Sequence, residues 1–217
     1  MSASRRYLAE FIGTFAIVFA ATGAMIVNDL NQGVITHLGN ALTSGLAVMV
    51  MIYAVGDISN AHFNPAVSFG FWLARHISAK QLAGYVVSEL SGALLASLLW
   101  RLITAQHATL GATVPSVPLL SAFVLEVVLT FFLVYVILHV ALTSRASNVL
   151  AGVAIGGTVA LNSIFAGPLT GASMNPARSL APALVSGQLD ALWLYLLAPL
   201  VGAALAVAAF QLLRKSV

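Results

Sequence analysis

Hydrophobic residues occur along the chain in long runs, and the intervals between these runs define its organisation. Six runs are about 20 residues long, the length that an α-helix needs to cross a hydrocarbon core roughly 30 Å thick. Because strict alternation of apolar and polar residues is missing, the runs predict helices and not barrel strands. The predicted spans are residues 7–28, 38–57, 80–103, 119–141, 147–166 and 190–213.

Two further apolar stretches, Val67–Ala74 and Ser179–Val185, are too short to cross. Each opens at an Asn-Pro pair, and Asn followed by Pro predicts a helix start, because Asn caps free backbone donors and Pro tolerates the first helical position. About ten residues reach roughly 15 Å, half of the core. We therefore expect two re-entrant half-helices, with the non-helical backbone before each buried in protein or lining a wet cavity.

The two halves of the chain repeat. Ala172–Ser179 matches Ala61–Ser68 at an offset of 111 residues. Two other pairs of landmarks agree at similar offsets: Glu10-x3-Thr14-Phe15 with Glu126-x3-Thr130-Phe131, and Tyr85-x6-Gly92 with Tyr195-x6-Gly202. Since each half holds three full spans, the second half must enter from the opposite side. We expect one channel domain, 1–217, made of inverted repeats 1–103 and 119–217.

Composition narrows the class. The chain is 60% hydrophobic and 7% charged with a mean hydropathy of +1.01, which predicts an all-α integral membrane protein. The pI of about 9.6 comes from few charges and indicates topology, not a nucleic-acid partner. Without cysteine there is no disulfide or thiolate metal site, and we expect no metal and no other cofactor. Arg5 and Arg6 precede a long run without a cleavage-site pattern, which favours a first span over a removed signal peptide.

Basic residues predict the orientation. Under the positive-inside rule, seven of the nine put both termini in the cytoplasm and the loop between the repeats outside, as expected for a multi-pass protein of the plasma or inner membrane. The seven are Arg5, Arg6, Arg75, Lys80, Arg145, Arg214 and Lys215. Of the other two, Arg101 and Arg178, the second lies in a re-entrant segment, where a charge is costly unless it faces water or acceptors.

The paired motifs suggest a pore. Half-helices from opposite faces would point their positive N-terminal ends at each other near the bilayer centre, which would repel cations and hydronium while the Asn64 and Asn175 amides donate to neutral solutes. One Asn-Pro-Ala is more often only a capped helix start. Two in repeat-equivalent positions favour a central constriction, made of Asn64, Pro65, Ala66, Asn175, Pro176 and Ala177.

These motifs, Arg178 directly after the second, and the two Glu-x3-Thr landmarks closely resemble the major intrinsic proteins, the aquaporins and aquaglyceroporins, over essentially the whole chain. The wording of Gly167–Ser179 and of His62–Val67 is most similar to the nodulin-type branch. The resemblance implies six transmembrane helices plus two re-entrant half-helices and a homotetramer with one pore per subunit. It implies a passive channel, not an enzyme, for water, glycerol and metalloid acids such as silicic, boric and arsenous acid.

The resemblance also implies a selectivity filter at Ser44, Ser163, Ala172 and Arg178. Strict water channels resemble one another in a large aromatic at the first position and His at the second, and glycerol facilitators in Trp at the first, Phe at the third and Asp at the position of Ser179. This chain departs from both patterns and resembles the silicic-acid-permeable group. Two serines and an alanine leave a wide opening with hydroxyls, and Arg178 adds fixed donors.

The glutamates within the spans and the histidines are the other polar residues to be interpreted. Glu10 and Glu126 are open to interpretation as proton or ion sites, but their equivalence in the repeat and the resemblance favour support of the re-entrant backbone. We expect His62 in the cytoplasmic vestibule. Glu89 stands where family members resemble one another in having Gln, and the sequence provides no physical account of it. The remaining histidines, expected at span ends or in packing, are His37, His76, His107 and His139.

Several alternatives remain at this point. Ser44 and Ser163 could be packing serines, since small residues let membrane helices approach closely. A water-selective channel is the main alternative. A secondary transporter would need a coupling-ion site, for which only Glu10, Glu89 and Glu126 could serve. An enzyme would need a catalytic constellation, and the nearest approach is His62 with Asp57.

Overall fold

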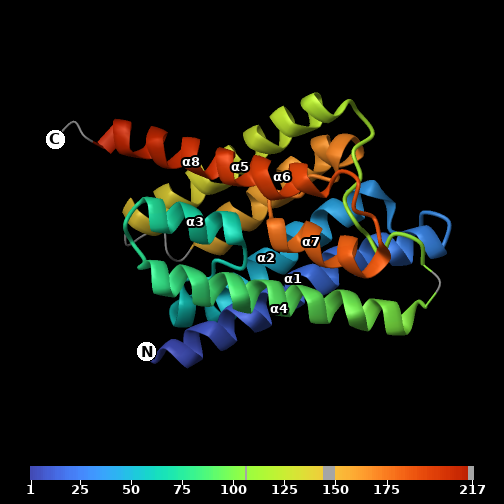
Figure 1. The fold of residues 1–217 in the computed structure, drawn as a ribbon, viewed down its shortest axis with the longest axis horizontal. Coiled ribbons are helices and arrows are strands. Elements are labelled where there is room, and N and C mark those ends of the chain that lie inside the picture. The colour runs from blue at the N-terminus through green and yellow to red at the C-terminus, as the bar shows by residue number, and fades with distance from the viewer. Residues whose placement is uncertain (106, 144–149, 215–217) are drawn as a thin grey trace.

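The computed structural model describes residues 1–105, 107–143 and 150–214, and this part of the chain is all helical (Figure 1). Six of its helices are long and apolar enough to cross a membrane, which confirms the predicted number of spans. They are α1 (Ala3–Leu30), α2 (Thr36–Ser59), α4 (Ala79–Ile103), α5 (Leu119–Thr143), α6 (Ala151–Thr170) and α8 (Leu192–Arg214). The fifth span ends four residues beyond the predicted 147–166, and residues 147–149, Arg145 and Lys215 lie outside the described residues.

The two predicted half-helices are present as α3 (Pro65–Leu73) and α7 (Pro176–Ser186). Each begins at the proline of its motif. The preceding asparagine caps it: Asn64 Oδ1 accepts the Ala66 N–H at 2.9 Å, and Asn175 Oδ1 accepts the Ala177 N–H at 2.9 Å. Proline adds no unpaired donor at this position, so asparagine and proline together account for the first two backbone positions of each helix.

The packing follows the inverted repeat. Helix α1 packs on α4 and α2, and its counterpart α5 packs on α8 and α6. The two halves meet where α2 crosses α6, at Gly45 and Gly156, which are equivalent in the repeat. A Cβ on Gly45 would lie 2.4 Å from the Gly156 carbonyl oxygen, and one on Gly156 would lie 2.5 Å from the Gly45 oxygen. Only glycine permits this backbone approach. The contact therefore lies on the pseudo-twofold axis that relates the halves.

The two ends of the bundle differ. The start of α1 and the end of α8 lie at one end, here called the terminal side, and the connection between α4 and α5 lies at the other, here called the loop side (Figure 1). That connection is tied to the second re-entrant segment. The Ser116 N–H donates to the Leu169 carbonyl at 2.9 Å, and Thr113 Oγ1 lies 2.7 Å from Ser179 Oγ. The α4–α5 loop thus covers the loop side of α7.

Candidate functional site: a channel past both half-helices

One channel extends between the helices past both Asn-Pro-Ala motifs. Residues of α1, α2, α5 and α6 and of both re-entrant segments line it. The predicted residues on this wall are Ser44, His62, Asn64, Ser163, Ala172, Asn175 and Arg178. The proline and alanine of each motif are buried in the first turns of α3 and α7 and are not part of the wall.

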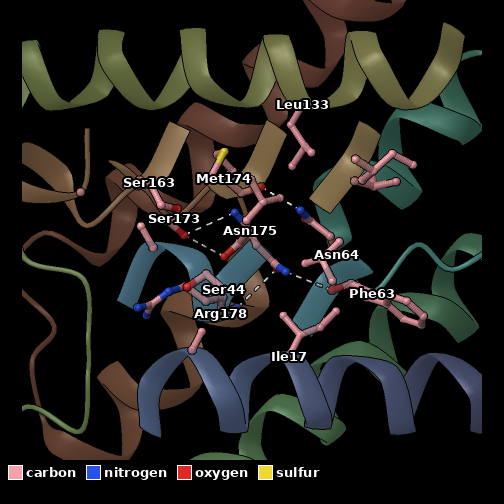
Figure 2. Close-up of a pocket in the computed structure, with 18 of the residues that line it drawn as sticks. Ile17, Ser44, Phe63, Asn64, Leu133, Ser163, Ser173, Met174, Asn175 and Arg178 are labelled. Carbon is pink, nitrogen blue, oxygen red and sulfur yellow. Dashed lines mark hydrogen bonds between the residues drawn. The ribbon is translucent and has the colours of Figure 1, made fainter. Parts of the chain in front are cut away.

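At the centre the two motifs bind each other. The Asn64 side-chain amide donates to the Met174 carbonyl at 2.8 Å, and the Asn175 amide donates to the Phe63 carbonyl at 3.0 Å (Figure 2). A primary amide has two N–H donors, so each asparagine keeps one beyond this bond. The reciprocal bonds hold the N-termini of α3 and α7 against each other at the middle of the channel.

The backbone before each motif adopts matching left-handed conformations. Ala61 and Phe63 have φ of 53° and 54°, and their equivalents Ala172 and Met174 have φ of 43° and 53°. A non-glycine residue in this region costs about 1 kcal/mol or more, so each must be held by its surroundings. The conformation is repeated in both halves, which indicates that the fold requires it.

Two buried carboxylates hold this backbone. Glu10 accepts the N–H groups of His62 at 3.0 Å and Phe63 at 2.6 Å. Glu126 accepts those of Ser173 at 2.9 Å and Met174 at 2.9 Å, and also the Thr170 hydroxyl at 2.7 Å. Neither glutamate lines the channel. Both carboxylates accept hydrogen bonds from the re-entrant backbone. This is the geometry expected if they support that backbone.

One carboxyl oxygen of Glu89 belongs to a hydrogen-bonded chain that reaches His62. The Ser68 hydroxyl donates to Glu89 Oε1 at 2.7 Å, and His62 Nδ1 lies 2.9 Å from the same Ser68 oxygen. Since Ser68 gives its proton to the glutamate, it accepts from Nδ1–H of the histidine, which leaves Nε2 as an acceptor. Nε2 has no hydrogen-bond partner within the described residues, and His62 lines the channel. The sequence motif contains His62 and Ser68 but gives no sign that Glu89 on α4 orients them.

On the loop side of the centre, four side chains of different elements face the channel. They are Ser44 of α2, Ser163 of α6, Ala172 before the second motif and Arg178 of α7. Arg178 is 7% exposed. Its Nη1 donates to the Gly111 carbonyl at 2.8 Å, and its Nη2 lies 3.0 Å from Met25 Sδ. Figure 2 shows Ser163 and Arg178 to one side of Asn175, with Asn64 and Phe63 to the other.

The repeat provides a matching set on the terminal side. At the offset of 111 residues, the equivalents of the four loop-side residues are Ile155, Ile52, Ala61 and Val67, and all four line the channel. This second ring holds no side-chain hydrogen-bonding group. The channel therefore has one polar ring and one apolar ring on opposite sides of the asparagines.

Three residues that the sequence motifs do not point to line the loop-side mouth. His37, Asn40 and Met25 line the channel beyond the polar ring. The sequence predicts His37 at a span end or in packing. It does lie in the first turn of α2, where its Nε2 is 2.7 Å from the Ile164 carbonyl oxygen, but it also faces the mouth. The signal was available, because positions 37, 40 and 44 share one helical face.

A search of known proteins agrees with this architecture. Residues 1–210 match the family model described as major intrinsic protein. The chain belongs to this family. It is 45% identical to aquaporin NIP1-1 of Zea mays over 97% of this chain and 75% of that protein. It is 46% identical to nodulin-26 of Glycine max over 92% of this chain and 74% of that protein.

A solved structure shows the same fold. The aquaglyceroporin from Plasmodium falciparum superposes with a TM-score of 0.86 at 25% identity, over 99% of this chain and 98% of that one. The relatives are aquaporin channels, which are passive transporters, so this chain is a multi-pass membrane channel and not an enzyme. Over residues 1–105, 107–143 and 150–214, no group of three or more His, Asp or Glu side chains could hold a metal ion.

Proposed function

We propose that this channel conducts water and small uncharged polyhydroxylated solutes, including glycerol and silicic, boric and arsenous acid, and that it excludes protons and ions. The observation that carries the proposal is the polar ring of Ser44, Ser163, Ala172 and Arg178 on the channel wall. None of the four is aromatic, so the ring combines width with hydrogen-bonding groups. Selectivity in such pores depends on diameter and on the donors and acceptors that line it.

The ring offers both kinds of partner. Ser44 Oγ donates to the Asn40 carbonyl at 3.0 Å, so its oxygen lone pairs are left for a passing hydroxyl. Arg178 has five N–H donors and keeps its charge. A solute with several hydroxyls can exchange its water shell for these groups and, further in, for the second N–H of Asn64 and of Asn175. Water has the same options and should also pass.

Ion exclusion has two sources. The N-termini of α3 and α7 direct their positive dipole ends toward the centre, and Arg178 adds a full positive charge at the polar ring. A cation is repelled at both places. An anion gains from the arginine but loses its hydration at the apolar ring, where Ile52 and Ile155 offer no donor.

The alternatives are weaker on the same geometry. A secondary transporter would need a coupling-ion site, yet Glu10, Glu89 and Glu126 do not line the channel. A water-selective channel would need a narrower ring. Counterflow under a proton gradient separates the first alternative, because a channel cannot accumulate solute. Osmotic shrinkage without solute-driven reswelling would indicate the second.

The test is solute uptake by proteoliposomes, measured by light scattering after an inward gradient of glycerol, boric acid or arsenous acid. Uptake faster than in empty vesicles supports the proposal, and equal rates with and without protein for all three solutes would refute it. Ser44→Trp should suppress glycerol uptake by at least about tenfold while sparing water, because the indole narrows the ring. Ser44→Ala is the matched control, since it removes the hydroxyl without adding volume.

We further propose a homotetramer in the plasma or inner membrane, with cytoplasmic termini and the loop side outside. The side of α2 that carries Leu38, Leu42 and Leu46 is exposed in the single chain and could contact a neighbour. Native mass spectrometry tests the tetramer. Orientation can be tested directly because the chain has no cysteine: in intact cells an impermeant maleimide should label Val114→Cys on the loop side and not Ser2→Cys.

A further inference from the structure

The α4–α5 loop holds the guanidinium of Arg178 in place. The Gly111 carbonyl accepts from Arg178 Nη1 at 2.8 Å. Gly111 itself has φ of +68°, and a Cβ there would lie 3.0 Å from Thr22 Cα. The turn is therefore pressed against α1 in a conformation that favours glycine. Any shift of this turn moves the acceptor on which the guanidinium depends.

The preceding residue is also left-handed, and a histidine holds it. Leu110 has φ of 50° and is 1% exposed. A bulky residue keeps this conformation only when its surroundings enforce it. Its buried N–H donates to His107 Nδ1 at 3.0 Å. A backbone N–H can only donate, so Nδ1 carries no proton, and the ring proton is on Nε2, which lies 3.4 Å from Asp29 Oδ2.

We propose that His107 is a positioning residue for the filter, whose unprotonated Nδ1 fixes the Leu110–Gly111 turn and thereby the Arg178 guanidinium. The inference rests on the proposed role of Arg178 in selecting solutes. It predicts that a proton on His107 Nδ1 lowers solute conductance. A pH series on the wild type and on His107 variants therefore tests the inference.

The charged groups around the ring do not replace the lost acceptor. Asp29 at the end of α1 faces Nε2, but its side chain is 58% exposed, so water screens the added attraction. Arg101 of α4 donates from Nη1 to the His107 carbonyl at 3.2 Å and does not depend on the ring. Both nitrogens of a protonated imidazole donate, so no rotation of the ring restores a partner for the Leu110 N–H. That buried donor is then left unpaired unless the turn moves.

A released arginine would narrow the pore. Without the Gly111 carbonyl, the guanidinium of Arg178 keeps, among the described residues, the Met25 thioether as its partner, and a thioether is a weak acceptor. The guanidinium is free to swing toward Ser44 and Ser163 across the ring. Solutes of glycerol size should lose more permeability than water, because they need the full width.

The experiment measures glycerol and water permeability of proteoliposomes from pH 5 to 8, with equal pH inside and outside. We expect wild-type glycerol permeability to fall roughly fivefold as the pH is lowered, because the Leu110 N–H loses its acceptor and the turn moves; the change for water should be smaller. His107→Asn should keep the pH 7.5 rate and lose the pH dependence, because the amide oxygen can replace Nδ1 but does not titrate. His107→Leu should give the low rate at every pH.

The controls separate the possible failures. His76→Asn, a histidine on the terminal side, should keep the wild-type pH profile. A pH profile of His107→Asn that matches wild type, or a wild-type rate in His107→Leu, would overturn the inference while leaving the proposed function intact. Absence of solute uptake by the wild type at every pH would instead refute the proposed function. If His107→Leu does not fold, the Asn variant alone decides.

Discussion

The two re-entrant segments are alike at the centre of the channel and different away from it. Asn64 and Asn175 each bind the first turn of their own helix and the backbone of the opposite segment, and Asn175 Oδ1 also accepts the Arg178 N–H. One step outward, the first segment presents Val67 where the second presents Arg178. The residues that match in the two repeats form the centre of the channel. The pair that does not match, Val67 and Arg178, lies where solutes can be distinguished.

The same contrast extends to the flanking helices. Ser44 and Ser163 line the loop side, and their repeat equivalents Ile155 and Ile52 line the terminal side. The loop side also has the α4–α5 connection, which joins the two repeats and so has no equivalent within either of them. Its Gly111 carbonyl accepts from Arg178. The inverted repeat therefore accounts for the arrangement of the helices. The polar ring comes from positions at which the two repeats carry different residues.

The largest expected effect is the loss of folded protein when Glu10 or Glu126, which hold the two re-entrant segments, is replaced. Glu126→Leu leaves two backbone N–H groups and the Thr170 hydroxyl buried without an acceptor, and Glu10→Leu leaves two N–H groups. At about 1–3 kcal/mol for each buried donor, both variants should lose much of the folded protein, and Glu126→Leu should lose more. Fluorescence-detected size exclusion after heating measures this. Gln at either position keeps one acceptor oxygen and should fall between; a wild-type melting temperature for both Leu variants would refute the supporting role.

Replacing Arg178 by the residue of its repeat equivalent, Val67, should weaken the exclusion of cations. Arg178→Val makes the second segment like the first and removes the fixed charge, so we expect cation conductance to rise by on the order of tenfold or more. Planar-bilayer recording checks this, with Arg178→Lys as the control that keeps charge but not the fork of donors. Unchanged conductance in Arg178→Val would show that the central helix dipoles alone exclude cations.

The central asparagines should give smaller effects on stability. Asn64→Ala and Asn175→Ala each remove one helix cap, at a cost of about 1 kcal/mol, together with one bond across the channel. Asn175 Oδ1 also accepts the Arg178 N–H at 3.3 Å, so the melting temperature of Asn175→Ala should fall at least as far as that of Asn64→Ala. A larger fall for Asn64→Ala would contradict this account of the two caps.

Much of this architecture could be predicted from the sequence because it depends on local signals. Asn64-Pro65 and Asn175-Pro176 mark helix starts by their own chemistry, and span lengths follow from bilayer thickness. Contacts between non-equivalent residues could not be predicted. A repeat pairs Asn64 with Asn175 but does not say that Asn64 reaches the Met174 carbonyl, nor that Glu89 binds Ser68, because those contacts depend on how the helices pack.

The most direct test of the account is the glycerol-to-water permeability ratio of two reciprocal double variants. Ser44→Ile with Ser163→Ile makes the loop-side ring like the terminal one, and Ile52→Ser with Ile155→Ser does the reverse. If solutes are selected at the polar ring, the first variant should lower the ratio by about tenfold or more, and the second should leave it within roughly twofold of wild type. Equal changes in both, or a larger change in the second, would contradict selection on the loop side.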